Sequence, residues 1–235
     1  MRFRSSIIAR GSVRVVCVFA PASHKRACLL SNWLGNNYNS RIQPPERHDV
    51  NIYSAWLLPR LLDTVMQQKQ MLPYRERIGA AANGRTLDVG IGSGLSLGFY
   101  GERTEQVVGI DPSAELLLFA EERAHKVSVP VELIRASAES LPLDDRSVDT
   151  VVSTFTLCSI GDAAIALSEM RRVLKPGGKL LFVEHGRAPD NGVARWQDRL
   201  TPLWSRVAGG CRLNRKPDDL ILSAGFLIDT LARGT

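Results

Sequence analysis

The fold of this chain is decided by the stretch Thr86-Leu87-Asp88-Val89-Gly90-Ile91-Gly92-Ser93-Gly94. Its apolar start predicts a buried strand that runs directly into a glycine-rich turn, and a helical pattern follows at 95–100. Glycines let the backbone approach a ligand closely, and the first turn of a helix offers free N–H groups. The stretch therefore predicts a ligand-binding turn, with a tight strand-to-helix turn that binds no ligand as the alternative.

A second buried strand, over 107–110, ends at Asp111, which lies 21 residues after Gly90. An acid at the tip of that strand is placed to accept hydrogen bonds from the ribose hydroxyls of a nucleoside. The alternative role for Asp111, as a helix N-cap before Pro112, is compatible with ribose binding. Together the two motifs predict an adenosine-type cofactor.

The glycine spacing distinguishes between adenosine cofactors. A nicotinamide or flavin site usually shows G-x-G-x-x-G, because a pyrophosphate rests on the helix N-terminus, whereas the spacing here is G-x-G-x-G. Asp88 stands two residues before the first glycine, where its carboxylate would repel a pyrophosphate. It suits a cofactor with an amino group and a sulfonium, as S-adenosylmethionine has. A hydrogen bond between Asp88 and the turn backbone is the alternative.

Strands and helices alternate outward from these motifs. Short apolar runs predict strands at 85–89, 106–110, 131–135, 148–153 and 179–184. Helical patterns fall at 113–126 and 162–174, with Ser113 and Asp162 as their N-caps. Such alternation predicts an α/β fold with a doubly wound, mostly parallel sheet.

The N-terminal part differs in composition. Residues 1–45 carry seven basic residues and no acid, so they account for the whole net charge of +6. We therefore predict that residues 1–48 form a basic, disordered extension or follow from a misassigned start, with a transit or signal peptide as the other alternative. Residues 49–84 are expected to be helical, at 54–72 and 74–82, and residues 85–235 to form the cofactor-binding domain. A nearly neutral domain predicts no nucleic-acid partner.

Cysteine and hydropathy patterns bound the remaining possibilities. The four cysteines form no CxxC pair and, by spacing, no metal-ligand cluster with the four histidines. Neither a disulfide framework nor a metal site is therefore expected, and a reducing compartment, the cytoplasm, is the expected location. No apolar run reaches the roughly 20 residues needed to span a bilayer.

Residues 85–185 resemble a class I S-adenosylmethionine-dependent methyltransferase, of the group containing the ubiquinone and menaquinone C-methyltransferases. The motifs that carry the resemblance are LDVGIGSG (87–94), VVGIDPS (107–113), ASAESLPLDDRSVDTVVS (136–153) and RRVLKPGGKLLFVEHG (171–186). A closer similarity is to bacterial relatives of the animal alkyl-thiol methyltransferases. It extends to YSAWLLPRLLD (53–63), TLCSI (156–160) and WQDRLTPLWSRVAGGC (196–211).

This resemblance implies roles for matching positions. Asp111 would hold the ribose hydroxyls, and Ser153 and Thr154 would border the methyl donor. The other implied cofactor-binding residues are Asp88, Gly90, Gly92 and Gly94 toward the methionine moiety and ribose, and Pro112, Ser113, Ala138 and Glu139 around the adenine. They lie at carboxyl ends of parallel strands, where ligands bind in open α/β sheets.

Methyl transfer is an in-line displacement at a sulfonium, so the protein mainly supplies alignment, which can contribute roughly 7–11 kcal/mol. His185, beside Glu184 at the end of the fifth strand, is the candidate catalytic residue, because an imidazole can deprotonate a thiol or hydroxyl. The alternative is a polar residue that closes the strand. Cys158 is expected to be a small buried residue rather than a nucleophile.

Residues 194–208 form an amphipathic helical pattern, which Pro202 is expected to interrupt or kink. Its apolar face carries Trp196, Leu200, Leu203, Trp204 and Val207. This face predicts either packing on the domain or a lid over an apolar acceptor, with peripheral membrane contact through Trp196 and Trp204. After a helix at 217–224 and a strand at 227–231, the resemblance implies one more antiparallel strand, which the sequence lacks, so an unpaired sheet edge is expected.

The sequence therefore predicts an S-adenosylmethionine-dependent methyltransferase that acts on a small apolar or amphipathic acceptor: a thiol, a quinone precursor or a lipid-like molecule. A non-catalytic binding module on a degenerate methyltransferase fold is the main alternative. An NAD(P)-dependent reductase is disfavoured by the glycine spacing and by the lack of a Tyr-x-x-x-Lys pair.

Overall fold

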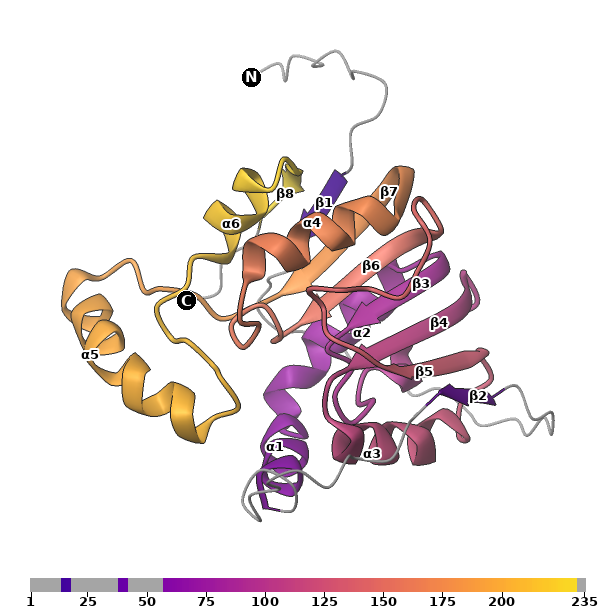
Figure 1. Ribbon diagram of the computed structural model, residues 1–235, viewed down its shortest axis with the longest axis horizontal. Helices are drawn as coiled ribbons and strands as arrows, with labels where there is room; N and C mark the ends of the chain where they lie inside the picture. The colour runs from indigo at the N-terminus through magenta and orange to yellow at the C-terminus, as the bar shows by residue number, and fades with distance from the viewer. Residues whose placement is uncertain (1–13, 18–37, 42–56, 232–235) are drawn as a thin grey trace.

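The computed structural model describes residues 14–17, 38–41 and 57–231, and their strands form one eight-stranded sheet (Figure 1). The strand order is β2-β5-β4-β3-β6-β7-β1-β8, and the neighbouring strands of this sheet pair in parallel. Its five central strands are β3 (Gly84–Val89), β4 (Thr104–Asp111), β5 (Val131–Arg135), β6 (Val148–Thr154) and β7 (Leu174–Val183). These strands confirm the parallel α/β sheet predicted from the apolar runs.

Helices cover both faces of the sheet. The helices of the described residues are α1 (Leu58–Met66), η2 (Lys69–Met71), α2 (Leu72–Ala81), η3 (Leu97–Phe99), α3 (Ala114–Ala124), α4 (Ala163–Val173), α5 (Asn191–Val207) and α6 (Pro217–Ser223). Side chains of α4 and α6 join one buried apolar cluster, and those of α2 and α3 join the other. Because successive strand residues face opposite sides, Val151 and Leu180 belong to the first cluster and Val152 and Leu181 to the second.

The N-caps predicted for the two crossover helices are confirmed. Ser113 Oγ accepts a hydrogen bond from the N–H of Leu116 at 3.2 Å. Asp162 Oδ1 accepts from the N–H groups of Ala164 and Ile165, at 3.0 and 3.1 Å. Each cap satisfies helix N–H groups that have no partner within the helix.

Two helix predictions differ from the structure. The helix expected over 95–100 is only the single turn η3, since Gly98 disfavours a helix and Tyr100 leaves the helical conformation with ψ of 122°. The helix expected over 54–72 ends at Met66, because Gln68 adopts an extended conformation with ψ of 137°. Pro73, which falls between the two predicted helices, lies at the start of α2, where its fixed φ is favourable.

Two short strands come from the region predicted to lie outside the fold. β1 (Arg14–Cys17) lies between β7 and β8 (Leu227–Thr230), and β2 (Tyr38–Arg41) pairs with β5 at the opposite edge. These eight residues differ from the predicted extension; the rest of 1–48 lies outside the described residues. The edge of β7 is therefore paired, since β1 satisfies the backbone groups that the expected antiparallel strand would have met.

In the part of the chain that the structure describes, no helix combines the length and the apolar character needed to cross a membrane.

Candidate functional site at the carboxyl edge of the sheet

The glycine-rich turn follows β3 and begins at the strand where the sheet order switches direction. Gly90, Gly92 and Gly94 all have positive φ, of 69°, 56° and 76°. A Cβ at Gly90 would lie 2.2 Å from a carbon of Thr156, and one at Gly94 would lie 2.9 Å from the Cα of Ala120. At Gly92 the nearest atom would be 3.9 Å away. Packing therefore requires the first and third glycines, while the second leaves its backbone open to a ligand.

Asp111, the last residue of β4, joins this turn to the start of α3. Its Oδ2 accepts from the N–H of Gly92 at 3.0 Å, and its Oδ1 accepts from the N–H of Ser113 at 2.9 Å. Burial raises the pKa of Asp111 to about 6, and the two backbone hydrogen bonds partly oppose that shift. Ser113, not Asp111, is the N-cap. Each carboxylate oxygen can still accept a second hydrogen bond, as ribose binding would require.

Asp88 lies within β3 and is only 2% exposed. The hydroxyl of Tyr100 donates to its Oδ2 at 2.7 Å. Burial raises the pKa of Asp88 to about 7, although the hydrogen bond from Tyr100 lowers it. Sequence patterns did not identify Tyr100, because a lone tyrosine after a glycine turn carries no recognisable spacing. The hydrogen-bond partner that the structure shows for Asp88 is therefore a side chain, whereas the predicted alternative was the turn backbone.

Glu184 immediately follows β7 and is buried. Its Oε1 accepts from the N–H groups of Thr156 and Leu157, at 2.6 and 2.7 Å, and from the hydroxyl of Ser153 at 3.3 Å. Its Oε2 is buried without a hydrogen-bond partner. Burial raises the pKa of this carboxyl to about 7. Glu184 therefore holds the loop after β6 and keeps one acceptor available, which fits a ligand with a cationic or N–H donor group.

The remaining predicted residues surround the same edge. Ser153 and Thr154 end β6, and the Thr154 hydroxyl is buried without a hydrogen-bond partner. Ala138 is buried, whereas Glu139 is half-buried and accepts from the N–H of Asp162 at 3.1 Å. Pro112 is exposed next to Asp111. The parallel strands bring the predicted residues of β3, β4 and β6 to one edge of the sheet, while Glu139 also anchors the start of α4.

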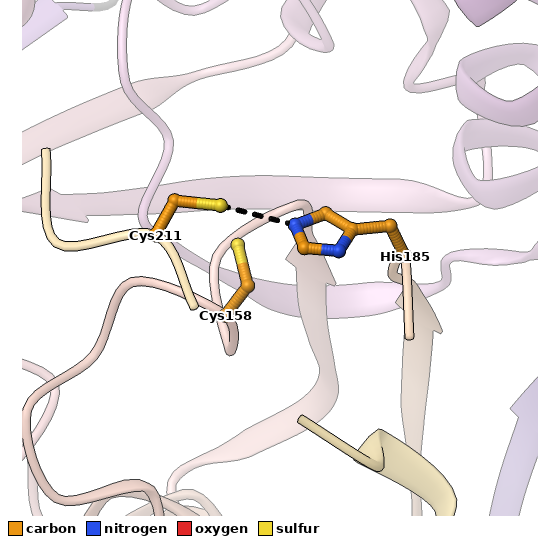
Figure 2. Close-up of side chains that lie close together, drawn as sticks. All are labelled: Cys158, His185 and Cys211. Carbon is orange, nitrogen blue, oxygen red and sulfur yellow. Dashed lines mark hydrogen bonds between the residues drawn. The ribbon is translucent and has the colours of Figure 1, made fainter. Parts of the chain in front are cut away.

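Three side chains near this edge form a cluster that the sequence did not predict (Figure 2). Cys158 follows β6, His185 follows β7, and Cys211 follows α5. His185 Nε2 and Cys211 Sγ lie 3.2 Å apart, and the ligand atoms of all three residues lie within 4.8 Å of one another. The expectation that cysteines and histidines form no ligand cluster is therefore wrong. Spacing alone could not reveal this cluster, because each residue comes from a separate loop.

Hydrogen bonding within the cluster separates the acidities of its two thiols. A hydrogen bond from Cys158 lowers the pKa of Cys211 to about 4, with further lowering by His185 and by the indole of Trp204. The same hydrogen bond, with burial, raises the pKa of Cys158. The hydrogen bond with Cys211 raises the pKa of His185. Cys211 is therefore the more acidic of the two thiols.

Helix α5 presents its apolar face to solvent, and Figure 1 shows this helix standing away from the sheet. Trp196 is 62% exposed and Leu203 is 64% exposed. The interpretation that this face packs on the domain is therefore wrong. Pro202 lies inside the helix without ending it. A Cβ at Gly209, just beyond the helix, would meet side chains of α1, so the end of α5 lies beside α1.

The comparisons with known proteins point to one family. The methyltransferase-domain family matches residues 87–182. The chain is 36% identical over 173 residues to the ubiquinone/menaquinone biosynthesis C-methyltransferase UbiE of Syntrophotalea carbinolica, covering 70% of this chain and 72% of that protein. It is 37% identical over 134 residues to thiol S-methyltransferase TMT1B of Rattus norvegicus, covering 55% and 54%. The chain thus spans about half the length of this second relative.

A solved structure agrees with this family. Phospholethanolamine N-methyltransferase 2 of Haemonchus contortus, in complex with phosphomonomethylethanolamine and S-adenosylhomocysteine, matches with a TM-score of 0.54 and 26% identity. The match covers 68% of this chain and 38% of that one.

Proposed function

This chain belongs to the family of S-adenosylmethionine-dependent methyltransferases, and we propose that it transfers the methyl group of that cofactor to a small apolar or amphipathic acceptor. The observation that carries the proposal is the group of three buried carboxylates, Asp88, Asp111 and Glu184, around a glycine turn whose Gly92 backbone is open. Buried carboxylates with raised pKa values suit a ligand that brings its own positive charges.

The residues of this edge fit the parts of S-adenosylmethionine, which supplies the methyl group on a sulfonium. Asp111 would accept hydrogen bonds from the ribose hydroxyls, and Gly92 would let the backbone lie against the cofactor. Asp88 and the unpaired Oε2 of Glu184 are acceptors suited to the ammonium group. Ser153 and Thr154 would border the methyl group, with Ala138 and Glu139 beside the adenine.

Alignment and exclusion of water would supply most of the catalysis. An acceptor that must lose a proton needs a further group. His185 was the sequence candidate for this base, but its Nε2 already contacts the Sγ of Cys211 at 3.2 Å. We therefore propose that deprotonation of the acceptor depends on the Cys158, His185 and Cys211 cluster rather than on a lone imidazole.

An apolar acceptor is supported by the exposed faces of α1 and α5. The exposed apolar side chains of the two helices are Leu57, Leu61 and Val65 with Val193, Trp196, Leu200, Leu203, Trp204 and Val207. The guanidinium of Arg199 lies 5.9 Å from the ring centroid of Trp196. Tryptophan with arginine suits a membrane surface, so a peripheral membrane contact through Trp196 and Trp204 is part of the proposal. The names of the relatives favour a thiol or a quinone precursor as the acceptor class.

Calorimetric titration of S-adenosylmethionine and S-adenosylhomocysteine into the full chain tests the cofactor. We expect micromolar binding. Transfer of a labelled methyl group to apolar thiols and to hydroxylated quinone precursors then tests the reaction. A folded chain that binds neither compound would overturn the proposal, and binding without any transfer would favour the non-catalytic binding module.

A further inference from the structure

The cluster of Cys158, His185 and Cys211 is held in place by the backbone around it. The N–H of Arg212 donates to the carbonyl of Cys158 at 2.9 Å, which ties the two cysteine-bearing loops together directly. A Cβ at Gly210, where φ is 84°, would lie 3.0 Å from the carbonyl oxygen of Ser159. A larger residue before Cys211 would therefore push the loops apart.

Two charged side chains brace the same loops. Arg215 donates to the carbonyls of Leu157 and Gly161, on either side of Cys158. Glu184, next to His185, accepts from the N–H of Leu157 at 2.7 Å. Hydrogen bonds other than those among Cys158, His185 and Cys211 thus hold the loops from which these three side chains converge. Convergence of this kind is the support that a precise metal site requires.

We propose that Cys158, His185 and Cys211 form a Zn²⁺ site with an open fourth coordination position. Two thiolates and one imidazole are a ligand set that zinc takes in proteins, and a site with three protein ligands leaves one position for water or substrate. Calcium and magnesium prefer oxygen ligands, which this cluster does not offer.

The separations fit this metal. Bonds of about 2.3 Å to sulfur and about 2.0 Å to nitrogen place tetrahedral ligand atoms about 3.5–3.8 Å apart. His185 Nε2 and Cys211 Sγ are 3.2 Å apart, and the three ligand atoms lie within 4.8 Å of one another. Side-chain shifts of about 1 Å would close the site. Cys158 is buried while His185 and Cys211 are half-buried, so the cluster is accessible from the side of His185 and Cys211.

Trp204 gives the site a further contact. It lies on α5, and its indole N–H interacts with the Cys211 thiol and lowers the pKa of that thiol. Hydrogen bonds to a ligating sulfur orient the ligand and adjust its charge. Through Trp204, the exposed apolar helix therefore borders the proposed metal site directly.

The open position defines an acceptor class, and this step rests on the proposed function. An apolar thiol would bind the metal through its sulfur and release its proton to solvent. The sulfur lone pair then forms the new bond to the methyl carbon as the bond from that carbon to the cofactor sulfonium breaks. The products are a methyl thioether and neutral S-adenosylhomocysteine. The thiol rather than the quinone precursor is then the acceptor, because sulfur is the softer ligand for zinc.

Cobalt substitution tests the site. The full chain is reduced, freed of metal and titrated with Co²⁺ under anaerobic conditions, and absorption is recorded. We expect one equivalent of Co²⁺ with sulfur-to-cobalt charge-transfer bands and the visible bands of a tetrahedral site, both lost on adding Zn²⁺. Cys158→Ser, His185→Gln and Cys211→Ser should each weaken Co²⁺ binding by about 100-fold.

Matched substitutions serve as controls. A variant with Cys17→Ser and Cys28→Ser, and a separate His125→Gln variant, should each keep one equivalent and the same bands. Circular dichroism reports the folding of each variant. The site is overturned if the folded chain gives no charge-transfer band, or if Cys211→Ser binds Co²⁺ as tightly as the unaltered chain and with the same bands.

Calorimetry with S-adenosylmethionine on the same samples separates the two proposals. Cofactor binding without Co²⁺ binding overturns the metal site and leaves methyl transfer standing. Co²⁺ binding without cofactor binding overturns methyl transfer and leaves the metal site standing. An apolar thiol added to the Co²⁺ protein should shift the visible bands; unchanged bands would overturn its assignment as a metal-bound acceptor.

Discussion

The carboxylate of Asp111 accepts a hydrogen bond from the N–H of Gly92 at 3.0 Å, and this contact joins the two motifs that carry the cofactor prediction. Asp111 ends β4, whereas Gly92 lies in the turn after β3, the neighbouring strand. The residue proposed to hold the ribose thus also positions the glycine whose backbone is open to the ligand. Cofactor binding should therefore depend on Asp111 twice, through its own oxygens and through the turn.

Replacement of Asp111 with asparagine tests that dependence. Asparagine keeps one acceptor oxygen but places an NH₂ group against one of the two backbone N–H donors. We expect S-adenosylmethionine affinity to fall by about 10–100-fold, or about 1.4–2.8 kcal/mol, while the fold is kept. Calorimetry measures the affinity and thermal unfolding the stability. Glu115→Gln, in the first turn of α3, is the matched control and should bind S-adenosylmethionine with unchanged affinity.

The pH dependence of stability follows from the raised pKa values of Asp88 and Asp111. In the folded chain these pKa values are about 7 and about 6, above the value of about 3.9 expected when unfolded. The folded state therefore holds protons that the unfolded state releases, so this stabilisation is present near pH 4 and is lost as pH rises toward 7. Without cofactor, the free energy of unfolding should fall by a few kcal/mol (on the order of 2 per group) between pH 5 and 8. Denaturant titrations across that range measure it, and a rise with pH would contradict the assignment.

Cofactor affinity should have the opposite pH dependence. S-adenosylmethionine carries positive groups that favour ionised carboxylates, so its binding should release protons and strengthen from pH 6 to 8. We expect an increase of about tenfold. Calorimetry in buffers with different ionisation enthalpies counts the protons released. Asp88→Asn should lose part of this release, and S-adenosylhomocysteine, which lacks the sulfonium charge, should show less of it.

Tyr100→Phe isolates the one side-chain donor to Asp88 that the structure shows. The change removes the hydroxyl at 2.7 Å and leaves the ring in the core. We expect a loss of about 1–3 kcal/mol in stability, greater at pH 8 than at pH 5, because the ionised carboxylate needs the donor more than the neutral form. Urea unfolding at the two pH values measures the difference. An equal loss at both would mean that Asp88 is not ionised over this range.

The central sheet was predictable from sequence because each buried parallel strand is a continuous apolar run between turn signals. The crossover helices were predictable for the same kind of reason, since Ser113 and Asp162 are local capping signals. Asp88 and Asp111 were found because they stand at fixed distances from a glycine motif. Glu184, Tyr100 and Cys211 were not, since their partners lie on other strands and loops and no spacing rule connects them. The strand at 14–17 was missed because a basic composition obscured four residues suited to a sheet.

The exposed apolar face of α5 was predictable as a pattern but not as a surface, because periodicity shows which residues share a face and not what covers it. The two tryptophans of α5 have different neighbours. Trp196 is exposed beside Arg199, whereas the indole N–H of Trp204 interacts with the Cys211 thiol and lowers its pKa. Substituting Trp196 and Trp204 one at a time should therefore separate the effect on membrane or acceptor contact from the effect on the Cys158, His185 and Cys211 cluster.

Trp196→Ala should weaken binding to vesicles containing anionic lipid by about tenfold, and it should raise the KM for apolar thiols with little change in kcat. Trp204→Ala should have the same effects and should also slow alkylation or metal binding at Cys211, because the sulfur loses an N–H donor. Vesicle co-sedimentation, steady-state kinetics and the cobalt spectrum measure the three effects. Cofactor affinity should stay within twofold in both variants, since neither side chain belongs to the carboxylate group. If both variants lose cofactor affinity and stability together, α5 is a structural support of the domain, and the apolar face is not the route to the acceptor.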